Sequence, residues 1–519
     1  SQRPKHDKKV VCYVASWAVY RPDPGRFNLE DLEPALCTHL IYSFAGLNEI
    51  TNTIKSLDPW QDLETDYGKA GYKRLVNMKQ KYPHLKVTLA IGGWNEGSPR
   101  YSTMASKPET RAAFIKSVVL INYKFDGLDL DWEYPTKREG KPYDRENFVL
   151  LVKELSEAFE PYGYILTAAL GAGKTTMETA YDLTKLSRYL DLIHMMCYDY
   201  HGTWDGVLGA NAPLKGVNDN DTLSVEWTVE YLLSHGVSPY KMVLGLPMYG
   251  RTFILLDPAT RVLEYGTTPV GSTGFKGPYT GEAGFMGYNE ICVQTMNKSS
   301  PWVYHWHEQS STPYIRDGEK VIAYDNGRSL AIKIKYAIDK GLGGVMVWSI
   351  DTDDFVGNCN ETDAYIDFVE RHKRMVDDPV VMKAVKNLNI PDGSKGPAYV
   401  IQDSKLTLRL PTPKYKNFAL MQSINDAVSL AIEEKRIMDE VKRLEGDNVV
   451  ETDDDDKGGS CSVRSSLFVP MCYVDTECFR NGVLKRHVRI FKLGITFIDP
   501  LTFIVILNFK NRNTDIKLS

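Results

Sequence analysis

Residues 126–135 read Asp-Gly-Leu-Asp-Leu-Asp-Trp-Glu-Tyr-Pro, and this short stretch decides what fold the sequence predicts. Successive side chains of a β-strand point to opposite faces. In a strand, Asp129, Asp131 and Glu133 would therefore share one face, while the leucine and tryptophan residues between them would share the other. The pattern predicts a buried strand that carries a line of acids on one side.

Similar short runs, rich in β-branched residues, continue in both directions from this strand and alternate with longer amphipathic stretches. Such alternation is typical of an α/β fold with a parallel sheet. In the stretch 144–159, apolar residues recur at spacings of three and four, which predicts a helix with one buried face. Eight strands are expected, the number that closes a (β/α)8 TIM barrel. The expected strands are 10–16, 39–45, 86–92, 127–131, 165–170, 192–196, 242–247 and 344–348.

The interval between the seventh and eighth expected strands is too long for a single helix. Residues 251–325 have the mixed strand and turn composition of a small α+β module, inserted between these two strands. Aromatic residues such as Trp302 and Trp306 argue against a disordered loop. An insertion at the carboxyl end of a barrel strand would deepen a cleft there.

The remaining segments have less distinctive patterns. Residues 1–9 form an extension without an apolar core, so any signal peptide is expected to have been removed already. Residues 377–459 are expected to be a linker, with an amphipathic helix at 418–444 and an acidic hinge at 453–457. The hinge also resembles an enteropeptidase recognition sequence. The apolar run 495–509 is too short and too interrupted for a membrane span.

Composition and charge limit the classes of function that the sequence can support. Lys and Arg total 62 and Asp and Glu total 67, so the net charge is only −5 and gives no support to a nucleic-acid partner. The 43% hydrophobic content excludes wholesale disorder. The aromatic content is high, with 30 Tyr, 18 Phe and 9 Trp, and exposed rings of this kind suit the apolar faces of sugars.

Cysteines and glycosylation triplets indicate a secreted protein. No two of the 8 cysteines have the close spacing of a zinc or redox site, so no metal is expected. Three Asn-x-Ser/Thr triplets, at Asn220, Asn297 and Asn360, permit glycosylation. Secretion is therefore the expected localisation.

The three acids of the fourth expected strand indicate catalysis. Burying several carboxylates close together raises the pKa of at least one, which leaves a general acid protonated near neutral pH. Helix caps or a metal site are the alternatives, but no histidine or further carboxylate cluster accompanies the run.

The string Asp126-x-x-Asp129-x-Asp131-x-Glu133 matches the DxxDxDxE signature of glycoside hydrolase family 18, and residues 9–374 resemble an animal chitinase catalytic domain of that family. Further matching motifs lie at the ends of other expected strands. They read AIGGWN at 90–95, MCYDYHG at 196–202, PMYGR at 247–251 and GGVMVW at 343–348. Position 90 is alanine where many relatives have serine.

The resemblance implies a role for each matching residue. Glu133 would be the acid and base, and the nucleophile would be the carbonyl oxygen of the substrate's own N-acetyl group. Asp131 would orient the acetamido N–H, and Asp129 would set the protonation of Asp131. Tyr198 and Asp199 match residues that hold the acetamido carbonyl, and Met196 matches a residue beneath it.

Aromatic residues at the barrel rim would line the rest of the cleft. By resemblance, Trp348 forms the floor under the distorted sugar, and Trp17 and Trp94 stack on sugars further along. Other matching contact positions are Tyr13, Phe44, Tyr134, Tyr249 and Arg251. The family's usual disulfides match Cys12 with Cys37 and Cys292 with Cys359, which leaves Cys197 as a buried free thiol.

The leading hypothesis is an endo-acting, monomeric chitinase without a cofactor that binds chitin and chitooligosaccharides. A chitinase-like lectin is one alternative, although such proteins commonly lose the acid that stands here as Glu133. An endo-N-acetylglucosaminidase acting on glycoproteins is another, but it would not need the three-tryptophan platform. The tail at 460–519 has no assigned fold, and its cysteine spacing faintly resembles the first half of a peritrophin-type chitin-binding module.

Overall fold

The protein is described here from a computed structural model, which covers residues 3–121, 123–390, 398–410 and 416–447, and the backbone of three strands within 461–492. The chain divides into two compact units, Ser1–Gly446 and Asp447–Ser519. All residues of the candidate site lie in the first unit.

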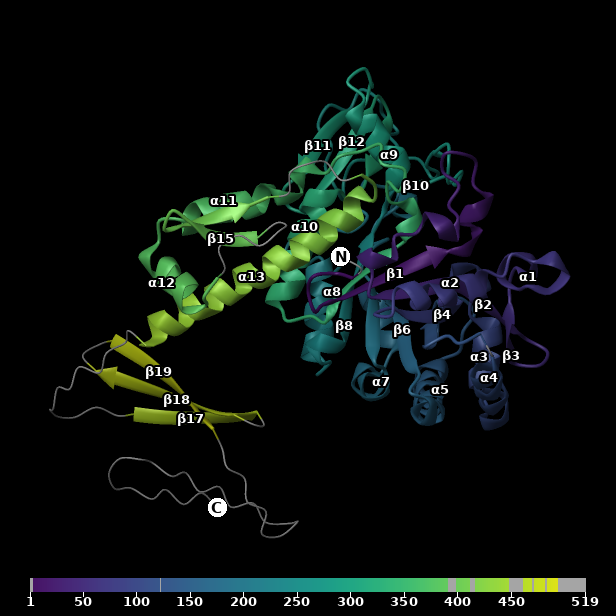
Figure 1. The fold of residues 1–519 in the computed structure, drawn as a ribbon, viewed down its shortest axis with the longest axis horizontal. Helices are drawn as coiled ribbons and strands as arrows, with labels where there is room; N and C mark the ends of the chain where they lie inside the picture. Colours follow the sequence, from purple (N-terminus) through teal and green to yellow (C-terminus); the bar gives the residue numbers. More distant parts are fainter. Residues whose placement is uncertain are drawn as a thin grey trace, which may run out of the picture. The chain divides into compact units, whose positions relative to one another are not determined.

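Within the described residues of the first unit, eight parallel strands close into a barrel, because the first strand pairs with both the second and the last (Figure 1). The TIM barrel predicted from the sequence is therefore confirmed, and each expected run falls on one barrel strand. A ninth strand, β3 (Thr53–Ser56), pairs antiparallel with the end of the second and was not predicted. The barrel strands are β1 (Lys9–Ala15), β2 (His39–Asn48), β4 (Lys86–Gly92), β5 (Gly127–Asp131), β6 (Ile165–Gly171), β7 (Leu192–Met196), β8 (Met242–Pro247) and β14 (Gly344–Trp348).

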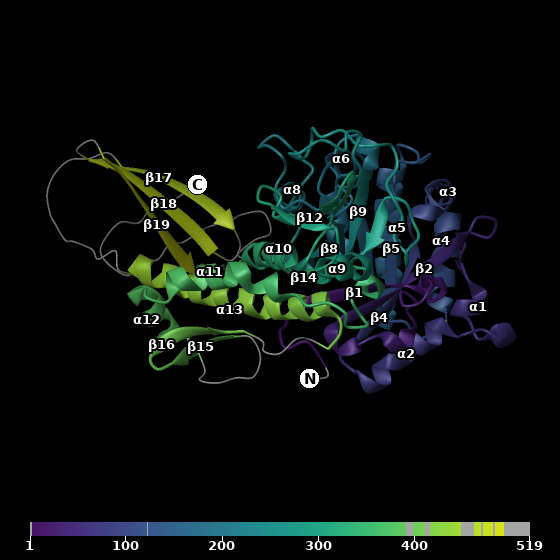
Figure 2. The ribbon, with the colours of Figure 1, turned by 90° about the horizontal axis from the view of Figure 1, so that it is seen from above.

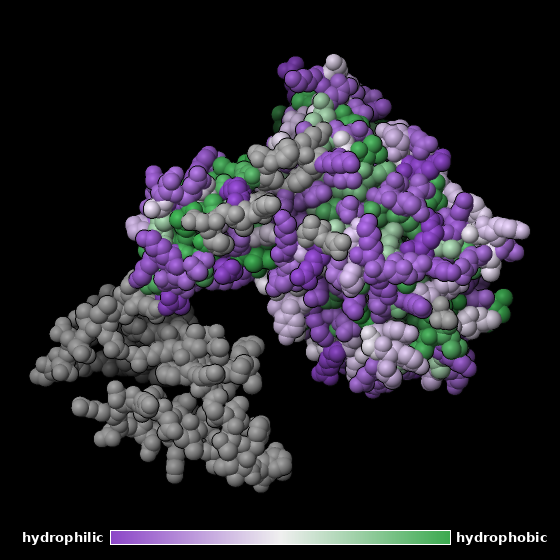
Figure 3. Space-filling model, in the orientation of Figure 1, coloured by the Kyte–Doolittle hydropathy of each residue, from purple (hydrophilic) through white to green (hydrophobic). Residues whose placement is uncertain are grey.

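Amphipathic helices cover the outside of the barrel (Figure 2). In α5 (Asp144–Phe159), the buried residues include Phe148, Leu151, Leu155 and Phe159, the spacing read from the sequence. On the face seen in Figure 3, hydrophilic residues predominate and apolar residues are scattered among them. The other α-helices between barrel strands, outside the insertion, are α1 (Pro59–Asp62), α2 (Gly71–Lys81), α3 (Pro99–Ala105), α4 (Pro108–Leu120), α6 (Lys174–Ala180), α7 (Leu183–Tyr189), α8 (Val225–Ser234) and α10 (Gly327–Asp339).

The expected insertion is present between β8 and β14. Its antiparallel sheet has the strand order β10-β9-β13-β12-β11, with one helix between β10 and β11. The insertion is thus an α+β module, as predicted. Its elements are β9 (Tyr249–Ile254), β10 (Phe285–Gly287), α9 (Tyr288–Met296), β11 (Val303–His307), β12 (Thr312–Asp317) and β13 (Lys320–Ala323).

The chain after β14 forms α11 (Ile366–Met375), α12 (Pro379–Asn387), the hairpin of β15 (Ala398–Gln402) with β16 (Lys405–Arg409), and α13 (Ala419–Asp447). The sequence pattern placed an amphipathic helix at 418–444, inside a linker. The helix is there, but it packs on the barrel instead of bridging two domains, and the compact unit continues to Gly446. The difference arises because its apolar face, including Leu420, Ile424 and Val428, is completely buried.

Hydrogen bonds fix the amino-terminal part of α13 on the barrel. The carboxylate of Asp353, just after β14, accepts from the backbone N–H groups of Leu420 and Met421 at 3.1 and 2.9 Å, which satisfies free donors in the first turn of α13. Further along, the amide of Asn425 donates to the carbonyl oxygen of Leu36 at 2.9 Å.

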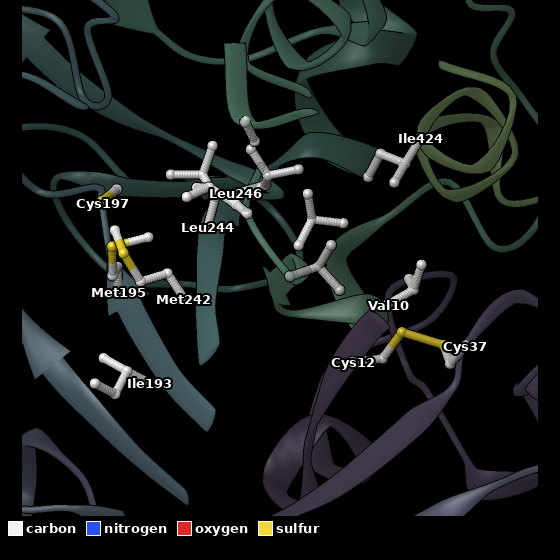
Figure 4. Close-up of a cluster of buried hydrophobic side chains, with 14 of the residues drawn as sticks. Val10, Cys12, Cys37, Ile193, Met195, Cys197, Met242, Leu244, Leu246 and Ile424 are labelled. Atoms are coloured by element: carbon white, nitrogen blue, oxygen red, sulfur yellow. A yellow bond between two sulfur atoms is a disulfide. The ribbon is translucent and has the colours of Figure 1, made fainter. Parts of the chain in front are cut away.

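The surface that α13 covers is one that the barrel otherwise leaves open. Residues 16–38, all of which are described, connect β1 to β2 through three short 3-10 helices and no α-helix. Ile424 of α13 belongs to the same buried cluster as Val10 of β1 and the Cys12–Cys37 disulfide (Figure 4). The helix thus shields the outer face of β1 where a helix of the repeating pattern is missing.

In the second unit, β17 (Cys461–Phe468), β18 (Met471–Arg480) and β19 (Val483–Lys492) form an antiparallel meander. The acidic run 453–457 and the apolar run 495–509 lie outside the described residues. In the part of the chain that is described, no helix has the length and apolar character needed to cross a bilayer.

Candidate active site

Three acids lie at the carboxyl end of β5, where the sequence placed them. Asp129 and Asp131 are buried on the inner side of the barrel, and Glu133 follows two residues beyond the strand. Leu128 and Leu130 belong to the outer core instead. The alternation read from the sequence therefore describes the strand correctly.

Asp129 is held by donors from three other strands. Its oxygens accept from the hydroxyl groups of Tyr13 at 2.5 Å and Thr167 at 2.7 Å, and Nδ1 of His194 lies at 3.1 Å. Since the Tyr13 hydrogen points to Asp129, Nδ1 of His194, 3.0 Å from the Tyr13 oxygen, must carry its own hydrogen. Three donors from three strands therefore fix the position of this one carboxylate.

Asp131 and Glu133 lie above this anion and are difficult to ionise together. Burial raises the pKa of Asp131 well above its usual value, and the negative charges of Glu133 and Asp129 add to this. Burial also raises the pKa of Glu133 to about 7; Asp199 acts in the same direction, while a hydrogen bond with Tyr134 and the charge of Arg138 oppose it. The pair therefore retains a proton near neutral pH.

Asp199 organises a second polar group at the ends of β7 and β8. Its Oδ1 accepts from the hydroxyl of Tyr249 at 2.6 Å and from Nε and Nη2 of Arg251 at 2.8 and 2.6 Å. Its own backbone has a left-handed φ of 56°, and its N–H donates to the side chain of Asn211 at 2.9 Å. Tyr198 packs edge-on against Tyr249 with ring centroids 6.0 Å apart.

Aromatic rings extend from the barrel centre to its rim. Trp348 stacks on Phe44 with centroids 5.7 Å apart, and Phe44 stacks on Trp17 at 5.9 Å. Trp17 is 42% exposed, and Trp94, at the end of β4, is 56% exposed with its ring 6.4 Å from that of Tyr134. Solvent-facing rings thus lie just beyond the carboxyl ends of β1 and β4.

The remaining residues named from the sequence also have defined places. Met196 is partly buried against the inner cluster of the barrel, together with Tyr198. Both expected disulfides, Cys12–Cys37 and Cys292–Cys359, are formed, and Cys197 is a buried free thiol.

Three residues of the site were missed by sequence reasoning. His194 and Thr167 hold Asp129, and the same period-two alternation, applied to β6 and β7, would have placed both on the inner face. Trp204 is 59% exposed and lies 5.1 Å from the guanidinium of Arg251, and no pattern in the sequence marks it.

The geometry supports acid–base chemistry on an uncharged ligand with flat apolar faces. A proton is held at the Asp131–Glu133 pair, next to Asp129, and exposed rings suitable for stacking lie beyond the ends of β1 and β4. Sugars have such faces.

Comparisons with known proteins identify the family to which the chain belongs. The family model "Glycosyl hydrolases family 18" matches residues 9–353. The chain is 48% identical over 441 residues to "Probable chitinase 2" of Drosophila melanogaster, an alignment that covers 83% of this chain and 82% of that one. It is 38% identical over 376 residues to "Endochitinase" of Manduca sexta, covering 70% and 67%.

Among solved structures, the Group IV chitinase of Ostrinia furnacalis in complex with allosamidin is similar, with 40% identity and a TM-score of 0.65, covering 71% of this chain and 99% of that chain. Human YKL-39, described as a pseudo-chitinase with retained chitooligosaccharide binding, has 33% identity and a TM-score of 0.62, covering 71% and 100%. The chain therefore belongs to glycosyl hydrolase family 18.

Proposed function

We propose that the chain is a chitinase that hydrolyses β-1,4-linked N-acetylglucosamine polymers and retains the anomeric configuration. One observation carries this proposal: the buried Asp131 and the partly buried Glu133 lie together above Asp129, so the pair retains a proton to give to a leaving group. The similarity to insect chitinases supports the choice of substrate.

In the first step, the Glu133 carboxyl group gives its proton to the glycosidic oxygen. The carbonyl oxygen of the substrate's N-acetyl group attacks C1, and the C1–O bond breaks with its electron pair going to the leaving oxygen. The product is a cyclic oxazolinium ion. Asp131 accepts a hydrogen bond from the acetamido nitrogen and stabilises the positive charge.

In the second step, water attacks C1 and gives a proton to the Glu133 carboxylate. The ring opens, the N-acetyl group is restored, and the two inversions at C1 together retain the configuration. Asp129 is held in place by its three donors, and its negative charge raises the pKa of Asp131.

The surrounding residues would hold the substrate for these steps. Tyr198 and Asp199 would position the acetamido carbonyl above Met196, and Tyr249 and Arg251 fix Asp199 in place. Trp348 would form the floor under the reacting sugar. The contact positions Phe44, Trp17, Trp94 and Tyr134 would lie along the same rim, whereas Tyr13, also expected as a contact position, is buried and would act through its hydrogen bond to Asp129.

We infer an endo mode of action from the exposed rings of Trp17 and Trp94, which lie beyond the ends of two different strands and suit contact with several sugars of a long chain. A second candidate function is that of a lectin, which binds chitooligosaccharides without cleaving them. The similarity to YKL-39, described as a pseudo-chitinase, supports this candidate. The presence of Glu133, Asp131 and Tyr198 favours the enzyme.

The test is product release from N-acetylglucosamine hexamer by the wild type and by Glu133→Gln, with isothermal titration of the hexamer as a second measurement. We expect the wild type to cleave, and the variant to bind with similar affinity while its kcat falls by about 10²- to 10⁴-fold. A wild type that binds the hexamer but releases no product would establish the lectin function instead.

We also propose that the protein is secreted and acts as a monomer. Two disulfides support an oxidising compartment. Of the three glycosylation triplets, Asn220 and Asn297 are exposed, whereas Asn360 is partly buried. Expression through a secretory pathway, followed by glycosidase treatment and light scattering, tests secretion, glycosylation and the monomeric state.

A further inference from the structure

The guanidinium group of Arg138 lies against the exposed tryptophan of the cleft. Its Cζ is 3.6 Å from the centroid of the Trp94 ring, well inside the range of a cation–π contact. The same guanidinium donates through Nη1 to the backbone carbonyl oxygen of Trp94 at 2.6 Å and to that of Glu133 at 3.2 Å. One side chain therefore joins the loop after β4 to the loop after β5.

The loop that carries Arg138 is built to keep this residue in place. Thr136, Arg138 and Glu139 have left-handed φ values of 69°, 52° and 70°, a conformation that surrounding contacts must maintain in non-glycine residues. Asp144, which is buried, provides such contacts by accepting from the N–H groups of Thr136 at 3.1 Å and Lys141 at 2.7 Å.

This contact leaves part of the indole available to a ligand. Trp94 is 56% exposed although a guanidinium covers part of its ring, so the ring face turned away from Arg138 is the one that can take a sugar. A tryptophan at the rim of a cleft would otherwise have rotamer freedom, which a ligand must remove on binding.

We propose that Arg138 is a positioning residue, which fixes the indole of Trp94 as a platform for a sugar ring and ties that platform to the loop carrying Glu133. The inference rests on the proposed function, since it assumes a sugar polymer in the cleft. A preorganised platform improves the binding of long substrates, which reach Trp94, more than that of short ones, which do not.

The charge of Arg138 provides a separate signature. Burial and the negative charge of Asp199 raise the pKa of Glu133. The positive charge of Arg138 and hydrogen bonds with Tyr134 and Asp131 lower it. Removal of this charge must therefore move the basic limb of the activity profile to higher pH, which a purely mechanical role would not do.

The test compares Arg138→Gln with Arg138→Lys, using Lys137→Gln as the matched control because it removes one positive charge from the same loop without touching Trp94. KM and kcat are measured on N-acetylglucosamine hexamer and dimer, and the pH profile is recorded on the hexamer. For Arg138→Gln we expect KM for the hexamer to rise roughly three- to tenfold, with a smaller change for the dimer. The basic limb of the pH profile should move to higher pH in Arg138→Gln alone. Arg138→Lys should return the limb to its wild-type pH but recover only part of the hexamer affinity.

Binding is measured separately from cleavage. The hexamer is titrated into Glu133→Gln, with and without Arg138→Gln. This measures the contribution of the Trp94 platform to affinity in a protein that does not cleave, so the binding test remains valid even if the proposed function fails. The inference is overturned if the two affinities agree, if hexamer and dimer lose affinity equally, or if Lys137→Gln has the same effect as Arg138→Gln. Equal melting temperatures of the variants exclude misfolding as the cause.

Discussion

Tyr13 on β1 and Asp129 on β5 are joined across the barrel interior by a hydrogen bond of 2.5 Å. His194 on β7 completes this arrangement, because its Nδ1 lies within 3.1 Å of the same carboxylate. The Asp129 side chain under the proposed acid pair is therefore fixed from several strands at once, and position 90, which is alanine in this chain, contributes no side-chain donor to it. The site can therefore be tested by replacing the residues that hold Asp129, as well as by replacing the acids themselves.

Replacing His194 should weaken catalysis without abolishing substrate binding. His194→Leu removes one donor from a buried carboxylate, and a hydrogen bond to a charged group contributes about 1.5–3 kcal/mol. We expect kcat on the hexamer to fall roughly ten- to a hundredfold while KM changes little. His194→Asn, which keeps an N–H donor, should recover part of the loss; equal kinetics for the wild type and both variants would contradict the role assigned to His194.

Activity should decline as the pH rises through about 7. The proposed acid must be protonated, and the pKa of Glu133 is raised to about 7, so the active form is present below this pH and is lost above it. Asp199→Asn removes a negative charge that raises this pKa, so its basic limb should move to lower pH. The measurement is kcat/KM against pH for both proteins, and a shift of the limb to higher pH in Asp199→Asn would be inconsistent with this account.

Trp94→Ala should reduce action on polymer more than on short substrates. Loss of a stacking ring is expected to cost about 1 kcal/mol in binding, a factor of roughly five, wherever a sugar reaches it. Product release from insoluble chitin and from the dimer is compared. Tyr240→Ala is the control, since Tyr240 is exposed next to the amino end of β8, on the opposite side of the barrel. Equal losses on both substrates would remove the argument for an extended cleft.

Ile424→Ala should destabilise the catalytic unit. Ile424 is completely buried on the apolar face of α13, and shortening such a side chain costs about 2–5 kcal/mol. Calorimetry should show a clear decrease in melting temperature, while Lys442→Ala, on the exposed side of the same helix, should leave it unchanged. A chain ending at residue 376, the boundary expected from the sequence, should be less stable still. An unaltered melting temperature in the truncated chain would mean that α13 is dispensable.

The barrel was predictable because strand periodicity and burial act together. The apolar runs such as 127–131 leave little choice of conformation, and the alternation of Asp129 and Asp131 with leucine specifies which side faces inward. The packing of α13 was not predictable in the same way. The periodicity of 418–444 indicates an apolar face, but the surface that covers this face lies next to β1, more than 400 residues earlier in the chain.

The same limit applies within the site. Glu133 and its neighbours form one continuous motif, whereas His194 and Trp94 are brought to it by separate strands. The contact of Arg138 with Trp94 depends on a loop whose left-handed residues, Thr136 and Glu139, are ordinary in sequence terms. Contacts between loops require the closed barrel, and no local pattern contains them.

The position of α13 has a consequence for biosynthesis. A nascent chain emerges from the ribosome in order, and domains generally fold as they are completed. The outer face of β1 is made first, yet its covering helix ends only at Asp447, so the apolar residues around Val10 and the Cys12–Cys37 bond remain without their helix until nearly the whole unit has been synthesised. The newly made enzyme therefore passes through a long interval in which its first strand is open to chaperones, to disulfide exchange and to contacts with other chains.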